Sequence, residues 1–286
     1  MVRIGDTSVI CGIRGELLPS TSIPQWRRPK SKTELESVED QDAEVREEGA
    51  RELRDYDLLV PNIELATGCA PQFLPGVPPT TLAQTLSTSV YSLLHSADLL
   101  DAEDLRVWYT PPNLDADADD KMVDDDVTEQ QEPEIKAYWV LYIDVLFVSF
   151  DGNPFDAAWI AILAALRDTK LPRARWDPDR EMVLCSRTEA KPLSIRGLPI
   201  ACTAAVLNER EAEVAGQSKS FVLVDPDRLE ESLCDESITV VVDRTTGETR
   251  IRGISKSGGR LLGPKEIREI SVTAESRWED IQQALG

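Results

Sequence analysis

Two groups of residues in this chain could do chemistry. The first is a turn at residues 151–156, between an apolar run that begins at Tyr138 and a second apolar run that ends at Leu166. A helix that starts at such a turn can bind a phosphate, because its first backbone N–H groups are free and its dipole is positive there. The second group is a pair of carboxylates, Asp225 and Glu231, whose oxygens could bind a hard cation such as Mg²⁺.

The elements around the turn follow from local composition. Residues 138–149 are dense in Val, Ile, Phe and Tyr and predict a strand. A tight turn at Asp151 and Gly152 follows, and Asp156 is expected to be the N-cap of the next helix. That helix is apolar nearly all round, so we expect it to be buried.

The turn itself disfavours an anion. Pro154 has no backbone N–H, so one donor is missing. Asp156 brings a negative charge to the place where an anion would bind. The helix dipole contributes only about 0.3–1 kcal/mol to an anion, so a carboxylate that already caps the helix disfavours a second negative group.

These segments resemble the RNase PH-like family, the phosphate-using 3′-exoribonucleases and their inactive relatives. Catalytic members carry Asp-Gly-Gly-Thr-Arg-Thr/Ser-Ala at the turn, and the resemblance implies that its Thr and Arg hold the attacking phosphate. Here Asn153, Pro154, Phe155 and Asp156 stand at the degenerate turn, with Phe155 in the place of the Arg. The turn is therefore similar to that of the non-catalytic branch.

The resemblance extends to the carboxylates. Residues 221–231 resemble the family's metal-binding segment, Leu-Asp-Leu-Asp-x-x-Glu-Asp, with Asp225 at the first catalytic Asp and Glu231 at the second. The resemblance implies that these two carboxylates are vestigial, because a metal without a phosphate site has no nucleophile to assist. The alternative is a plain acidic loop between residues 221–224 and 237–243.

Two further segments, residues 3–17 and 58–65, resemble ring subunits of the RNA exosome. The resemblance implies an α+β, two-lobed RNase PH-like fold (ribosomal protein S5 domain 2-like), with mixed sheets packed on helices. We expect one such domain over residues 1–286, with a first lobe at about 1–178 and a second at about 195–286. Family members usually carry an extra N-terminal segment, so the sheet is expected to miss an edge partner or the N-terminus to be incomplete.

The function implied is that of a non-catalytic structural subunit of the exosome ring. It would support 3′-to-5′ RNA processing and degradation, including rRNA maturation, by ring assembly and RNA threading. The implied partners are other RNase PH-like subunits, S1/KH cap subunits, RNA and an associated catalytic nuclease, in nucleus, nucleolus and cytoplasm. No cofactor, metal or membrane is expected. The alternatives are an active phosphate-dependent 3′-exoribonuclease with a site shared between neighbouring subunits, and a stand-alone binding protein of the same fold.

The net charge of −21 is concentrated in two segments. Residues 34–57 hold eleven Asp and Glu against three Arg, and residues 115–134 hold ten Asp and Glu against one Lys. We predict acidic loop insertions at residues 27–57 and 111–134, which leave the remaining body nearly neutral. The five cysteines are spread widely and are expected to be buried free thiols.

Basic residues near the C-terminus are candidates for RNA contact. Arg250 and Arg252 belong to a predicted hairpin at residues 237–254, and Lys256 follows it in the same basic stripe. Phosphate contacts need such charge. Aromatic residues for base stacking are missing there, and a solvated edge or a salt-bridged interface is the alternative. Arg173 and Arg175 are weaker candidates.

The remaining periodicity predicts a helix at residues 80–100, strands at 180–185 and 199–207, and a final helix from Pro264. His95 is the only histidine and is expected to be an ordinary packing or surface residue, so neither Ser-His-Asp chemistry nor a His-rich metal site is expected.

Overall fold

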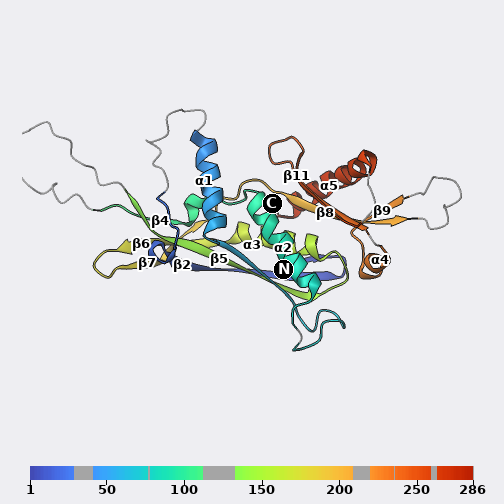
Figure 1. The fold of residues 1–286 in the computed structure, drawn as a ribbon, viewed down its shortest axis with the longest axis horizontal. Coiled ribbons are helices and arrows are strands. Elements are labelled where there is room, and N and C mark those ends of the chain that lie inside the picture. Colours follow the sequence, from blue (N-terminus) through green and yellow to red (C-terminus); the bar gives the residue numbers. More distant parts are fainter. Residues whose placement is uncertain are drawn as a thin grey trace, which may run out of the picture.

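A computed structural model shows two lobes, each built on its own β-sheet and placed side by side along the long axis of the molecule (Figure 1). The structure describes residues 1–28, 41–76, 78–111, 133–208, 220–234, 236–258 and 263–285. The predicted α+β class with mixed sheets and helices is confirmed.

The sheet of the first lobe is centred on the long apolar strand predicted from the sequence. Its strands run in the order β1-β2-β5-β3, and β4 also pairs with β5. Only the β3–β5 pair is parallel. The strands are β1 (Val2–Ile4), β2 (Thr7–Pro19), β3 (Leu59–Leu65), β4 (Arg106–Tyr109) and β5 (Glu134–Ser149).

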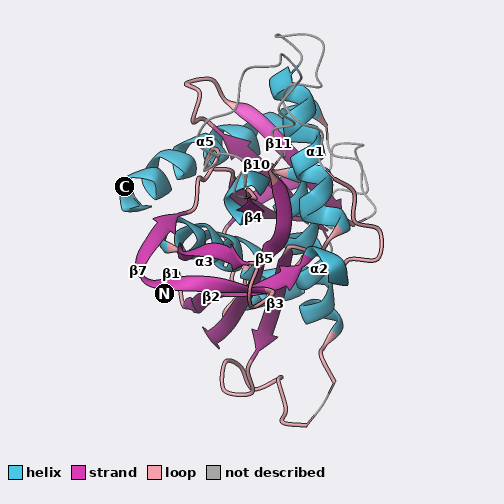
Figure 2. Ribbon diagram, turned by 90° about the vertical axis from the view of Figure 1, so that its left-hand side faces the viewer, coloured by secondary structure: helices cyan, strands magenta, loops and turns pink. Residues whose placement is uncertain are grey.

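Two helices, α2 (Thr81–Ser96) and α3 (Pro154–Asp168), cover one face of this sheet (Figure 2). Ten of the fifteen residues of α3 are buried, as the apolar sequence of this helix predicts. Because α3 also packs against β8, it lies between the two lobes and its first turn faces both. Short 3₁₀ helices, η1 (Ser20–Ser22) and η3 (Ala102–Leu105), lie beside the sheet.

The second lobe has a four-stranded sheet in the order β11-β10-β8-β9. Helix α5 packs on it and buries Ile270, Ala274 and Trp278. A separate ribbon of two strands, β6 and β7, lies at the far end of the first lobe (Figure 1). These elements are β6 (Lys170–Asp177), β7 (Met182–Pro192), β8 (Ile200–Asn208), β9 (Ser220–Val224), α4 (Arg228–Leu233), β10 (Glu236–Asp243), β11 (Arg250–Ser257) and α5 (Pro264–Leu285).

The prediction that residues 27–57 form an acidic loop is wrong for their second half. Helix α1 (Gln41–Asp55) forms there. It is held by Leu53, which is 5% exposed, and by buried Glu52, which pairs with Nη2 of Arg106 at 2.8 Å. Residues 29–40 of the first predicted insertion and 112–132 of the second lie outside the described residues, while Glu134, at the end of the second, already belongs to β5.

The cysteines are partly as expected. All five are free, but only Cys69 and Cys202 are buried, while Cys11 and Cys234 are half-buried and Cys185 is exposed. The prediction of five buried thiols is therefore wrong for Cys185, which lies on the solvent-facing β7 ribbon. No helix in the described part of the chain is long and apolar enough to cross a membrane.

Candidate functional site

The turn that precedes α3 differs from the sequence prediction in its cap. Asn153, not Asp156, is the N-cap of α3, with a left-handed φ of 44°, and Pro154 follows at the first helical position. Asn tolerates this conformation better than most residues, and proline is favoured at the first helical position. Asp156 instead turns inward toward the second lobe, where it is 0% exposed.

Buried Asp156 is fully engaged by its neighbours. Thr203 of β8 donates to it twice, from its backbone N–H at 2.9 Å and from its hydroxyl at 2.7 Å. Nη1 of Arg277, on α5, lies 2.9 Å from Oδ2 of Asp156. Burial raises the pKa of Asp156, while Arg277 and the hydrogen bonds from Thr203 act in the opposite direction.

The vestigial carboxylate Asp225 joins the same network. The side-chain amide of Asn153 donates to Oδ1 of Asp225 at 2.5 Å and to Oδ2 of Asp156 at 3.0 Å. Nη2 of Arg277 lies 3.8 Å from the same Oδ1 of Asp225. Asn153 and Arg277 therefore each connect the two carboxylates, and the turn of the first lobe is tied to both β9 and α5.

Glu231 completes the network from α4. Its Oε1 accepts the backbone N–H of Asn153 at 2.8 Å, so a carboxylate of the chain takes the first donor at the start of α3. Burial raises the pKa of Glu231, and the N–H of Asn153 opposes that shift. The alternative of a plain acidic loop is wrong here, because residues 228–233 form α4, which Asp227 caps through a capping box with Glu230.

We call these five residues, Asn153, Asp156, Asp225, Glu231 and Arg277, the carboxylate cluster. Sequence analysis identified four of them, and the structure brings those four together. It missed Arg277, because nothing in the local pattern of α5 distinguishes this arginine from the exposed ones. In the described part of the chain, no group of three or more His, Cys, Asp or Glu is arranged to hold a metal ion.

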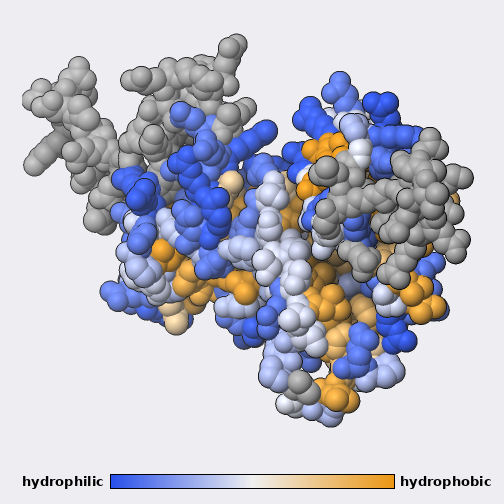
Figure 3. All heavy atoms as spheres, turned by 45° about the vertical axis from the view of Figure 1, so that its right-hand side comes forward, coloured by the Kyte–Doolittle hydropathy of each residue, from blue (hydrophilic) through white to orange (hydrophobic). Residues whose placement is uncertain are grey.

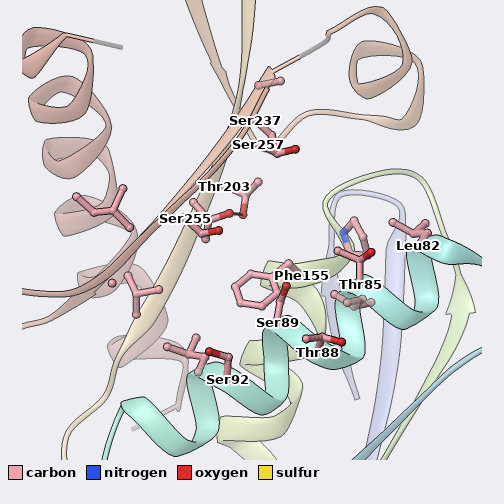
Figure 4. A pocket seen from close by; sticks show the side chains of 18 of the residues that line it. Leu82, Thr85, Thr88, Ser89, Ser92, Phe155, Thr203, Ser237, Ser255 and Ser257 are labelled. Carbon is pink, nitrogen blue, oxygen red and sulfur yellow. Dashed lines mark hydrogen bonds between the residues drawn. The ribbon is translucent and has the colours of Figure 1, made fainter. Parts of the chain in front are cut away.

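A cleft of about 750 Å³ opens beside the cluster, between α2 and the sheet of the second lobe (Figure 4). The side chain of Phe155 points into it, between Ser89 of α2 and Ser255 of β11 (Figure 4). Hydroxyl groups dominate its lining. They belong to Thr85, Thr88, Ser89, Ser92 and Ser96 of α2 and to Thr203, Ser237, Thr239, Ser255 and Ser257 of the sheet.

The cleft carries no positive charge on the described residues that line it, and the charged side chains among them are the carboxylates Glu231 and Glu236. Figure 3 shows apolar side chains gathered in a hollow of the surface that is bordered by hydrophilic ones. The sequence signal for the cleft was the row of Ser and Thr at helical spacing on α2, which sequence analysis did not use.

The predicted RNA-binding residues lie on β11 and are not among the residues that line the cleft. Nη2 of Arg252 pairs with Oδ2 of Asp243 at 3.1 Å, and Nζ of Lys256 donates to the carbonyl of Gly258 at 3.0 Å. Arg250 is exposed. Of the weaker candidates, Arg173 pairs with Glu189 at 3.1 Å. RNA contact by these residues stays a prediction.

Comparison with known proteins agrees with this architecture. The model of the 3′ exoribonuclease family, domain 1, matches residues 1–172, and that of domain 2 matches residues 197–277. The chain is 27% identical over 278 residues to exosome complex component rrp43 of Schizosaccharomyces pombe, covering 97% of this chain and 77% of that protein. It is 24% identical over 278 residues to exosome complex component Rrp42 of Archaeoglobus fulgidus, covering 95% and 76%.

Solved structures share the fold. The Archaeoglobus fulgidus exosome with RNA bound to the active site superposes with a TM-score of 0.61 at 22% identity, over 99% of this chain and 81% of that one. An archaeal exosome core gives a TM-score of 0.52 at 20% identity, over 98% and 78%. The expected two-lobed RNase PH-like fold is confirmed, as is the resemblance to the exosome subunit called ribosomal RNA-processing protein 43. This chain belongs to the 3′ exoribonuclease family, with domains 1 and 2 of that family in order along its length.

Proposed function

We propose that this chain is a non-catalytic subunit of an exosome ring, which supports 3′-to-5′ RNA processing and degradation through assembly rather than chemistry. Relatives that match nearly the whole chain are named exosome complex components. The observation that carries the non-catalytic part of the proposal is the carboxylate cluster, in which Asn153 and Arg277 already contact the carboxylates of Asp156 and Asp225.

The start of α3 has few free hydrogen-bond donors for a phosphate. Pro154 has no N–H, and the N–H of Asn153 already donates to Glu231 at 2.8 Å. Asp156 and Glu231 place negative charge around this helix end, and the side chain of Phe155 brings no donor. Since the neighbouring cleft has no Lys or Arg among its described lining residues, nothing there neutralises the charge of an RNA 3′ end.

The carboxylates are equally unsuited to Mg²⁺. Oxygen atoms that would coordinate a cation instead accept hydrogen bonds from Asn153 and Thr203, and the guanidinium of Arg277 lies against Asp156 and Asp225. A fixed cation of the protein thus stands where a metal would compensate these charges. The residues present therefore do not fit the divalent metal ion that catalytic members of the family are expected to bind.

The same proposal places the chain with other RNase PH-like subunits, S1/KH cap subunits, RNA and an associated catalytic nuclease. Nucleus, nucleolus and cytoplasm are the proposed locations. Arg250, Arg252 and Lys256 remain the proposed RNA contacts, with Arg250 the best placed because Arg252 already pairs with Asp243.

The experiment has two parts. The tagged chain is purified gently from its own cells, and stoichiometric recovery of other RNase PH-like chains is expected. The recovered complex is then assayed for phosphate-dependent release of nucleoside diphosphates from 3′-labelled RNA, with Asp225→Asn in this chain and Asp151→Asn as the matched control. Equal rates for all three forms are expected. A large loss with Asp225→Asn alone contradicts the proposal and favours the catalytic alternative.

A further inference from the structure

The proposed function gives no role to the cleft between α2 and β11. We propose that it receives an extended peptide segment of a neighbouring chain, which adds a strand to the free edge of β11. The identification of that chain as an RNase PH-like subunit rests on the proposed function. The mode of binding rests on the geometry of β11 and of the cleft.

The backbone of β11 offers the first argument. In the described part of the second lobe, β11 is the outermost strand and pairs only with β10. Every residue of β11 except Gly253 is exposed, and the apolar side chains of Ile251 and Ile254 are 50% and 49% exposed. An unpaired edge of eight residues presents a row of free N–H and C=O groups, which an extended segment can pair with.

The lining of the cleft offers the second argument. Three hydroxyl residues of α2 face three of the sheet across it, and the side-chain hydroxyls of these six make no hydrogen bond to another described residue. They are Thr85, Ser89, Ser92, Ser237, Ser255 and Ser257. A hydroxyl both donates and accepts, so this lining suits the amide groups and small polar side chains of a peptide.

The charge of the lining excludes RNA from the cleft. RNA binding draws on Lys and Arg near the phosphates, and the described lining residues include only Glu231 and Glu236 as charged groups. Phe155 and Val241 add an apolar surface. The occupant we infer is therefore an uncharged or weakly basic segment with small side chains, rather than a nucleic acid.

The first test compares backbone hydrogen exchange of the free chain with that of the complex reconstituted from co-expressed RNase PH-like subunits. We expect the amides of β11 to exchange at least about tenfold more slowly in the complex. Strand β9, the opposite edge of the same sheet, is the internal control. An assembled complex in which β11 exchanges as fast as in the free chain overturns the inference but leaves the proposed function intact.

The second test places a bulky charge in the cleft. Ser255→Arg is expected to lower the recovery of the neighbouring chain at least about tenfold, a difference worth about 1.4 kcal/mol. Thr246→Arg, on the exposed turn after β10, adds the same charge outside the cleft and is expected to leave recovery unchanged. Equal thermal unfolding of both variants shows that the fold is intact.

Three results count against the inference. Equal recovery with Ser255→Arg and Thr246→Arg overturns it, and so does crosslinking of RNA to residues that line the cleft, such as Ser89 and Ser255, in the wild-type complex. If no complex forms from any combination of subunits, the proposed function fails and this inference fails with it.

Discussion

At the level of single residues, the contact that matters most is the one between Arg277 and Asp156. The Asp156 side chain is 0% exposed and that of Arg277 is 15% exposed, so each charge depends on the other. We expect Arg277→Met to lower the free energy of unfolding by about 3–5 kcal/mol, because it leaves a buried carboxylate without its cation. Urea unfolding followed by circular dichroism measures the loss.

The control for this prediction removes both charges. Arg277→Met combined with Asp156→Asn should recover most of the lost stability, since no unpaired charge is then buried. Arg3→Met, which breaks an exposed pair with Asp6, should change stability by less than about 1 kcal/mol. A small effect of Arg277→Met alone would show that the cluster does not depend on this ion pair.

His95 predicts a second residue-level effect, on pH dependence. Its ring lies 4.3 Å from that of Tyr91, and neither ring nitrogen has a hydrogen-bond partner in the described structure. Burial lowers the pKa of His95, an effect that Asp57 opposes and Arg54 reinforces. Because the folded-state pKa lies below that of the unfolded chain, this residue's contribution is complete above a pH of about 6.5 and is lost as the pH falls below it.

The variant His95→Phe keeps an aromatic ring beside Tyr91 but cannot titrate. We expect the thermal stability of the wild type, relative to this variant, to decrease between pH 7.5 and pH 5.5. Comparing the two proteins at each pH cancels the titration of the many carboxylates they share. A difference that stays constant over this range would contradict the prediction.

At the level of elements, the turn before α3 is fixed by its contact with the segment that leads into α4. Gly152 has a φ of +94°, and a Cβ there would lie 2.4 Å from the carbonyl oxygen of Pro226. The neighbour is backbone, so it cannot move aside without shifting α4 and with it Glu231. We expect Gly152→Ala to lower the free energy of unfolding by more than about 3 kcal/mol, measured by urea unfolding.

Gly247 provides the matched control. It also has a positive φ, +84°, but a Cβ there meets nothing within 4 Å. Gly247→Ala should therefore lower the stability by only about 1 kcal/mol, the conformational part of the effect. If the two substitutions cost the same, the close approach between the turn and the α4 segment is not important for folding.

Elements also show how far sequence reasoning reaches. Strand β5, helix α3 and the β10–β11 hairpin follow from local composition and turns, and all three are present. Helix α1 was missed because its acidic composition resembles that of a loop, while its stability comes from Leu53 and from the pairing of Glu52 with the distant Arg106. Local pattern predicts an element well where its own residues are apolar, and poorly where a distant partner stabilises it.

At the level of the whole molecule, the site combines segments that are far apart in sequence. Asn153 and Asp156 come from the first lobe, while Asp225, Glu231 and Arg277 come from the second. Single segments of sequence identified the altered turn and the carboxylates. They could not show that the cluster is closed by Arg277 or that a cleft without cations lies beside it. The first follows from the packing of α5 on the second sheet, and the second from the placement of α2 across the cleft from that sheet.

The distribution of charge leads to the last prediction. Residues 112–132 hold nine Asp and Glu against one Lys, and the residues on either side of them are paired, with Tyr109 opposite Glu134. A short Gly/Ser linker can therefore replace this segment without disturbing β4 or β5. We expect unchanged thermal unfolding but severalfold tighter non-specific binding of single-stranded RNA in about 0.05 M salt, because the negative charge that repels phosphates is reduced. At about 1 M salt, where the Debye length is about 3 Å, the gain should disappear.

A linker of the same length as the natural segment that keeps the nine acidic residues is the control, and it should bind RNA as the wild type does. Equal binding by both linker variants at low salt would show that the segment acts through its bulk or its sequence, and not through its charge.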